Sequence, residues 1–160
     1  MIFLTVGTCP IPFDRLVTKV DELVSGKLIE DEVFAQIGFC TYRPKHFEYA
    51  EMMDKRDFDA VYGEADGVVG HAGIGTILMG LERGKPLLTM PRMKRYREHV
   101  NDHQVATAQH FESEGSTLVA YRTEELLVQI ADLKAFTPKR GGMEAGAISG
   151  RIGDFLSEIG

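Results

Sequence analysis

The chain has 160 residues, of which 44% are hydrophobic and 26% are charged, and its formal net charge is −6. A chain of this length can bury a core as one domain without disulfides or a metal, and no apolar run approaches the ~20 residues of a membrane-spanning helix. The negative charge argues against general nucleic-acid binding, so no nucleic-acid partner is expected. No basic leader precedes the first apolar run, and we therefore expect a cytoplasmic protein.

Short apolar runs alternate with segments of helical periodicity, which is the pattern of βαβ units around a parallel sheet. Expected strands are residues 2–6, 33–37, 67–70, 86–90 and 117–120, with a loop or short edge strand at 46–53. Expected helices are residues 13–24, 56–65, 74–84, 101–113 and 123–133. Gly84 is expected to end the third helix, and Thr123 to begin the last. The sequence thus predicts an α/β fold, a Rossmann-like three-layer parallel sheet.

The composition changes near the end of the chain. Residues 1–136 are expected to form the Rossmann-like domain, and residues 137–160 a Gly-rich linker with a short amphipathic helix. That helix would present an apolar face either to the body of the protein or to a partner. The face consists of Ile152, Phe155, Leu156 and Ile159.

The stretch of residues 66–78 runs from an apolar strand through a glycine-punctuated turn into a helix. Gly70, Gly73 and Gly75 let the backbone approach a ligand closely, and the first helical turn presents unpaired N–H groups to an anion. The spacing fits neither the dinucleotide fingerprint nor the Walker loop. A phosphate site is predicted, with a tight turn that binds nothing as the alternative.

Ligands of doubly wound sheets bind beyond the carboxyl ends of the strands. Gly7 and Thr8 follow the first strand, and residues 98–104 hold six hydrogen-bonding side chains just before a helix. The alternative is that Asn101 or Asp102 only caps the helix and the histidines are solvated, but a cap needs one such residue and not six.

Other candidate groups are ambiguous. Cys9 and Cys40 fit no metal-ligand spacing and are expected to be small buried or partly buried side chains. No Ser/His/Asp set and no Cys/His cluster is recognisable, so no metal site is expected. A basic patch has four members within six residues, which are Arg92, Lys94, Arg95 and Arg97. It would meet lipid headgroups or a lipid-linked diphosphate, or form a solvated loop.

Four ordered motifs, at residues 3–16, 71–78, 84–87 and 98–104, carry a family resemblance. With them, residues 1–135 resemble the C-terminal, nucleotide-sugar-binding half of the family 28 glycosyltransferases. The chain looks most similar to the short single-domain subunit type, found in the dolichol-pathway UDP-N-acetylglucosamine transferase and in bacterial exopolysaccharide and capsule synthesis. In that family two Rossmann-like domains face each other as a GT-B enzyme, so the resemblance implies half an enzyme. A separate membrane-anchored, acceptor-binding subunit would complete it and recruit it to the inner face of the membrane.

The resemblance implies an inverting transfer from a UDP-sugar to a lipid-linked saccharide, with no metal or cofactor. The positions that it assigns to the donor are Gly7 and Thr8 near the phosphates, Gly73, Gly75 and Thr76 at the diphosphate, and Asp102 and Gln104 at the sugar. The general base tends to come from the acceptor half, and the candidates within this chain are His71, Glu98 and His99. Taken alone, a histidine such as His71 is more often structural than catalytic.

One position departs from the family pattern. Met79 stands where many relatives carry a Glu that accepts hydrogen bonds from the ribose hydroxyls, so Glu82 would have to replace it or nucleotide affinity would fall. A non-catalytic subunit with a decayed nucleotide site is therefore the alternative, and a stand-alone nucleotide hydrolase is a weaker one. A half-enzyme also leaves an apolar face to cover, which keeps homo-oligomerisation open.

Overall fold

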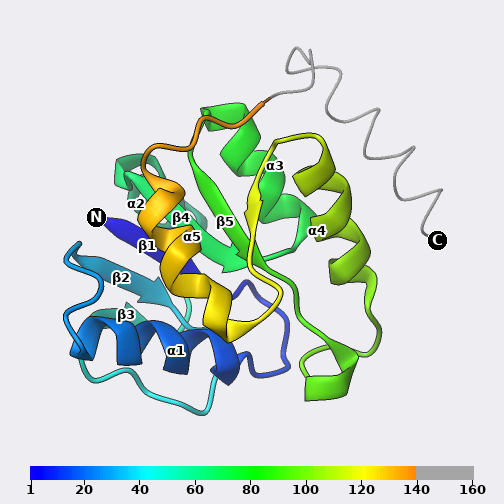
Figure 1. Ribbon diagram of the computed structural model, residues 1–160. Helices are drawn as coiled ribbons and strands as arrows, with labels where there is room; N and C mark the ends of the chain where they lie inside the picture. The colour runs from blue at the N-terminus through cyan, green and yellow to red at the C-terminus, as the bar shows by residue number, and fades with distance from the viewer. Residues whose placement is uncertain (140–160) are drawn as a thin grey trace.

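The computed structural model describes residues 1–139, which form a six-stranded sheet in the order β3-β2-β1-β4-β5-β6 (Figure 1). The strands are β1 (Ile2–Thr5), β2 (Val33–Gln36), β3 (Glu48–Ala50), β4 (Gly67–His71), β5 (Leu87–Met90) and β6 (Leu118–Val119). The helices are α1 (Asp14–Ser25), α2 (Lys55–Glu64), α3 (Ile74–Arg83), α4 (His103–Ser113) and α5 (Leu126–Leu133), with short 3-10 helices η1 (Lys94–Tyr96) and η2 (Thr123–Glu125). Every neighbouring strand pair is parallel, which confirms the predicted fold class.

Helices cover both faces of the sheet, with α1 and α5 on one face and α2, α3 and α4 on the other (Figure 1). Strand β1 lies at the centre and is apolar on both sides. Its Leu4 packs in the cluster that contains α1 and α5, whereas its Phe3 packs in the cluster that contains α2 and α3. Burial on two faces explains why this strand reads as a continuous apolar run.

Several element boundaries differ from the prediction. Residues 46–53 contain the edge strand β3, which is largely exposed. Gly84 ends α3 in the left-handed conformation, as predicted (φ 64°). The last helical segment begins at Thr123 as predicted, but its first turn is the 3-10 helix η2, and α5 starts only at Leu126. Helix α4 starts at His103 because the side chain of Asn101 accepts the His103 N–H and holds a turn before it.

Within residues 1–139 no helix has the length and apolar character needed to cross a membrane. The amphipathic helix expected near the end of the chain lies outside the described residues, and so does most of the linker before it.

Candidate functional site

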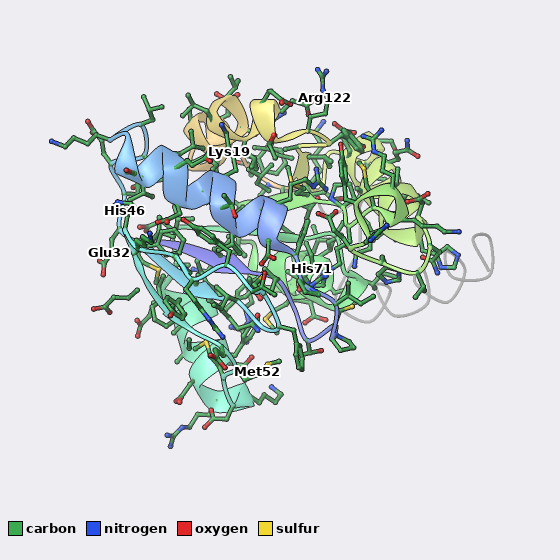
Figure 2. The ribbon with its side chains drawn as sticks, turned by 90° about the horizontal axis from the view of Figure 1, so that it is seen from below. Lys19, Glu32, His46, Met52, His71 and Arg122 are labelled. Carbon is green, nitrogen blue, oxygen red and sulfur yellow. The ribbon has the colours of Figure 1, made fainter. Side chains whose placement is uncertain are left out.

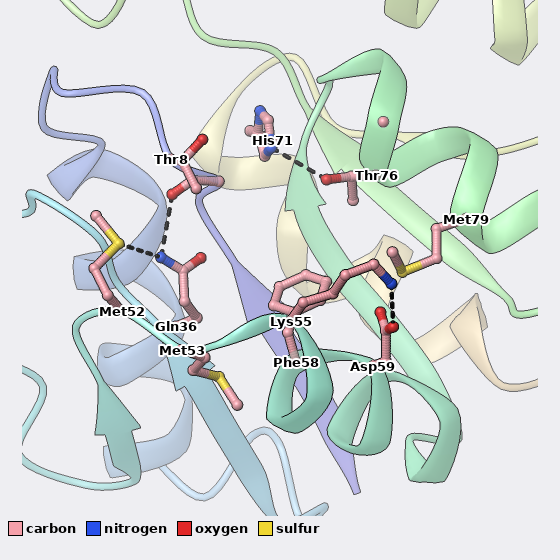
Figure 3. Close-up of a pocket in the computed structure, with 12 residues that line it drawn as sticks. Thr8, Gln36, Met52, Met53, Lys55, Phe58, Asp59, His71, Thr76 and Met79 are labelled. Atoms are coloured by element: carbon pink, nitrogen blue, oxygen red, sulfur yellow. Dashed lines mark hydrogen bonds and ion pairs between the residues drawn. The ribbon is translucent and has the colours of Figure 1, made fainter.

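The chain reverses its direction of strand addition between β1 and β4, and a cavity of about 530 Å³ opens at the carboxyl ends of these strands (Figure 3). This is the switch point at which open α/β sheets bind ligands. Figure 2 shows the molecule from below and labels His71 and Met52, which both line this cavity. The cavity is lined by Gly7, Thr8, Gln36, Met52, Met53, Lys55, Phe58, Asp59, His71, Gly75, Thr76 and Met79. The two predicted phosphate loops therefore meet at one cavity.

Helix α3 begins at this cavity without a cap. Its N-cap residue is Gly73, no side chain accepts from its first N–H groups, and its first turn has no acidic residue. A Cβ added to Gly75 would meet no atom within 4 Å, although Gly75 lines the cavity. Packing within the described residues thus gives no reason for a glycine at position 75. A ligand that approaches the backbone closely would give such a reason.

The imidazole of His71 is enclosed between two turns of backbone. A Cβ on Gly7 would come within 2.4 Å of its Nε2, and one on Gly73 within 2.1 Å of its Cε1. The backbone of Gly7 also has a positive φ of 78°. Both glycines are therefore required to hold the ring, which hydrogen-bonds Thr76 Oγ1 at 3.2 Å and Gln104 Nε2 at 3.3 Å. Burial, together with the charges of Arg92 and His99, lowers the pKa of His71 to about 3.

Sequence reasoning missed Gln36, which fixes the loop after β1. Its Oε1 accepts the hydroxyl of Thr5 at 2.7 Å, and its Nε2 donates to the carbonyls of Gly7 at 3.1 Å and Glu51 at 3.0 Å. The side chain is 3% exposed. A lone amide in the apolar run of residues 33–37 was the available signal, because a buried amide must find partners.

Sequence reasoning also missed the wall of the cavity formed by α2 and the loop before it. Met52, Met53 and Phe58 contribute apolar surface, and Met79 faces them from α3 (Figure 3). At the edge of this wall Lys55 donates to Asp59 at 2.6 Å. The wall suits a flat apolar group.

The predicted basic patch is wrong for Arg92, whose side chain is fully buried. The guanidinium donates to the carbonyls of Val6 at 2.8 Å, Ile11 at 2.7 Å and Glu98 at 3.1 Å, and it stacks on the ring of Phe13. Burial lowers its pKa. Arg92 therefore ties the loop after β1 to the loop after β5, while the exposed cations Lys94, Arg95 and Arg97 remain at the surface.

The carboxylate of Glu98 is engaged on both oxygens. Arg15 donates to Oε1 and Oε2, each at 2.9 Å, and the Met93 N–H donates to Oε1 at 3.1 Å. Glu98 is only 4% exposed, takes a structural position and does not line the cavity. His99 also lies outside the lining, and its Nδ1 accepts the Asn101 N–H at 3.4 Å.

Neither Asp102 nor Gln104 is part of the lining of the cavity. Asp102 is exposed, and its Oδ1 accepts the Lys94 N–H at 2.9 Å. Gln104 accepts the Arg92 N–H at 3.1 Å and reaches the cavity only through His71. Over residues 1–139, no three His, Cys, Asp or Glu side chains are grouped to hold a metal ion.

Comparison with known proteins gives a consistent assignment. The family model described as the glycosyltransferase family 28 C-terminal domain matches residues 1–150. The chain is 33% identical over 122 residues to "UDP-N-acetylglucosamine transferase subunit ALG13" of Mus musculus, and 33% identical over 123 residues to the Homo sapiens protein of the same name. Each match covers 71% of this chain and 10% of the relative, so the chain spans about a tenth of the length of these curated relatives.

Solved structures share the fold. MurG of Acinetobacter baumannii has a TM-score of 0.56 and 19% identity, over 87% of this chain and 43% of that one. The glycotransferase of kitacinnamycin has a TM-score of 0.60 and 21% identity, over 93% of this chain and 37% of that one. An NMR solution structure of ALG13 has a TM-score of 0.58 and 17% identity, over 92% of both chains. The fold is that of one Rossmann-like half of a GT-B glycosyltransferase.

Proposed function

Because this chain belongs to the glycosyltransferase family 28 C-terminal domain family, we propose that it is the donor-binding subunit of an inverting glycosyltransferase that uses a UDP-sugar. In the proposed reaction an acceptor hydroxyl attacks the anomeric carbon of the sugar, the bond from that carbon to the diphosphate breaks, and UDP leaves. The acceptor is a lipid-linked saccharide, and the proposed setting is exopolysaccharide, capsule or related glycan synthesis.

The open N-terminus of α3 carries this proposal. Its free N–H groups, the positive end of its dipole and the vacant space at Gly75 suit a diphosphate. Charge develops on that diphosphate as UDP leaves, and oriented backbone dipoles stabilise such charge without a metal ion. Gly7 and Thr8 stand across the cavity from this helix end and complete the phosphate site.

The apolar wall of the cavity is the proposed nucleobase site. Phe58, Met52 and Met53 offer the apolar surface that a flat base requires, next to the helix end. Met79 offers no charged acceptor to the ribose hydroxyls. We therefore expect Met79→Glu to strengthen binding of UDP more than that of 2′-deoxy-UDP, as measured by calorimetric titration of both. An equal change for both nucleotides would place the ribose elsewhere.

The general base is proposed to come from a membrane-anchored acceptor-binding partner. Both ring nitrogens of His71 are hydrogen-bonded, and Glu98 is held by Arg15. This leaves His99 as the remaining in-chain candidate. The name of the two mammalian relatives, which calls them subunits, supports a partner of this kind. The partner would hold this chain at the cytoplasmic face of the membrane.

Calorimetric titration of the full chain with UDP, UMP and uridine tests the donor site. We expect saturable binding of UDP, weaker binding of UMP and still weaker binding of uridine, because the helix end contributes only through phosphate. If UDP shows no saturable binding even with the partner present, the donor site is refuted.

Met79 also favours a second candidate, a non-catalytic subunit that keeps the fold without the nucleotide. In that case Asp102→Ala and Gln104→Ala would leave both complex formation and transfer intact. Under the donor-subunit proposal the complex forms but transfer falls strongly.

A further inference from the structure

A chain of hydrogen bonds leads from the backbone after β5 to the Thr76 hydroxyl in the cavity wall. We propose that Gln104 and His71 are positioning residues that hold the Thr76 hydroxyl as a hydrogen-bond donor toward a phosphate of the ligand. The proposal rests on the proposed function for the identity of the ligand. The direction of each hydrogen bond follows from the protein alone.

The amide of Gln104 has only one favourable orientation. The main-chain N–H of Arg92 can only donate, and it lies 3.1 Å from Gln104 Oε1. The amide nitrogen must then face His71, where it lies 3.3 Å from Nδ1. An amide NH₂ group is a donor, so Nδ1 accepts and carries no proton. Arg92 cannot turn away, because its guanidinium is fixed by the carbonyls of Val6 and Ile11.

The proton of His71 therefore sits on Nε2. With its pKa lowered to about 3, mainly by burial, the ring is neutral near pH 7 and has a single N–H. Nε2 lies 3.2 Å from Thr76 Oγ1, so it donates to that oxygen (Figure 3). The ring lies against the backbone of Gly7 and Gly73, so close that a Cβ on either glycine would come within 2.4 Å of it.

The hydroxyl of Thr76 is consequently left with its own proton to donate. Threonines in helices commonly donate to a carbonyl one turn back, and Thr107 does so to His103 at 2.9 Å. For Thr76, His71 is the only hydrogen-bond partner of the hydroxyl within residues 1–139. Because His71 donates to the oxygen, the hydroxyl proton is directed to a ligand. An ionised phosphate can only accept, so it matches this donor.

The substitution Gln104→Glu reverses the direction of the hydrogen bonds through His71, with almost no change in the shape of the side chain. The new carboxylate accepts the Arg92 N–H on one oxygen and requires a proton on His71 Nδ1 at the other. Nε2 then becomes an acceptor, and the Thr76 hydroxyl turns its proton toward His71 and away from the ligand. Nitrogen-15 NMR of the His71 imidazole, recorded without ligand, shows directly which ring nitrogen carries the proton. We expect the Nε2–H tautomer in the unsubstituted protein and the Nδ1–H tautomer in the variant.

Affinity for UDP tests the consequence. We expect Gln104→Glu and Thr76→Val each to weaken UDP binding by about tenfold, which is the usual effect of losing a hydrogen bond to a charged group. In the Thr76→Val background the Gln104→Glu substitution should have little further effect, because there is no hydroxyl left to reorient. Thr76→Ser should restore affinity. Gln109→Glu, at an exposed position on the same helix, controls for the added charge.

The outcomes separate the two proposals. An Nδ1–H tautomer in the unsubstituted protein, or additive effects of the two substitutions, overturns the positioning role. Absence of UDP binding to the unsubstituted protein refutes the proposed function, and the tautomer spectra then decide the positioning role alone. Should Gln104→Glu fail to fold, the spectrum of the unsubstituted protein and the comparison of Thr76→Ser with Thr76→Val still test it.

Discussion

Gly75→Ala should make the protein more stable and less able to bind its ligand. Alanine is favoured over glycine in a helix interior by about 1 kcal/mol, because glycine loses more backbone entropy on folding. Gly75 is the second residue of α3, so we expect a gain of about 0.5–1 kcal/mol in the free energy of unfolding. No atom lies within 4 Å of the added Cβ, and no steric cost offsets this gain in the free protein.

The same methyl group stands in the cavity, beside the N–H groups that a phosphate must approach. Losing even one charge-assisted hydrogen bond there would cost about 1.5–3 kcal/mol, which corresponds to at least a tenfold weaker affinity for UDP. Chemical denaturation measures the stability, and calorimetric titration with UDP measures the affinity, on the same samples.

Two glycines serve as controls. Gly63 lies in α2, and a Cβ there would meet only Arg83 Nη1 at an ordinary 3.7 Å. We expect Gly63→Ala to raise stability without changing UDP affinity. Gly80 of α3 packs closely, since a Cβ would lie 2.9 Å from the Tyr62 hydroxyl, and Gly80→Ala should lower stability. If Gly75→Ala gains stability and binds UDP as tightly as the unsubstituted protein, the phosphate does not bind at the N-terminus of α3.

Three further predictions follow from buried groups. Glu98→Gln should lower the free energy of unfolding by about 3 kcal/mol, because Arg15 loses its charged partner; an unchanged denaturation midpoint would contradict this. His71 has a pKa of about 3 when folded, against an ordinary 6.5, so the unfolded chain binds the proton first. The free energy of unfolding should be at its full value above about pH 6.5 and should fall below it by up to ~1.4 kcal/mol per pH unit. Denaturation experiments from pH 7 to 4 should show a shallower dependence of this free energy on pH in His71→Asn. Burial raises the pKa of Cys40 to about 11, so mass spectrometry should find a thiol reagent on the partly exposed Cys9 well before Cys40; equal rates at both would contradict the burial.

Local signals predicted the fold and two of the loops that line the cavity. Apolar periodicity reports which faces are buried, and glycine reports where the backbone must turn or be approached, so β1, β4 and the turn into α3 could be located from short windows. The same signals placed Gly7 and Gly75 at one edge of the sheet, since parallel strands end together. The structure confirms that both line one cavity.

The part that sequence could not predict depends on partners far along the chain. Arg92 and Val6 are 86 positions apart, and Arg15 and Glu98 are 83 apart. Nothing in a single sequence distinguishes a cation that will be buried from the exposed cations beside it, such as Lys94. Burial of Arg92 is decided by which carbonyls the folded loops bring to it.

These long-range ties also determine how rigid the site is. Arg92 joins the carbonyls of Val6 and Ile11 to that of Glu98, and Arg15 joins α1 to the same Glu98 and to the Pro91 carbonyl at 3.2 Å. These contacts hold the loop after β1 and the loop after β5 together. A site fixed before the ligand arrives loses less entropy on binding. Removal of the contacts of Arg15 or Arg92 should therefore weaken ligand binding because the loops around the cavity lose their fixed positions, even though neither side chain lines the cavity.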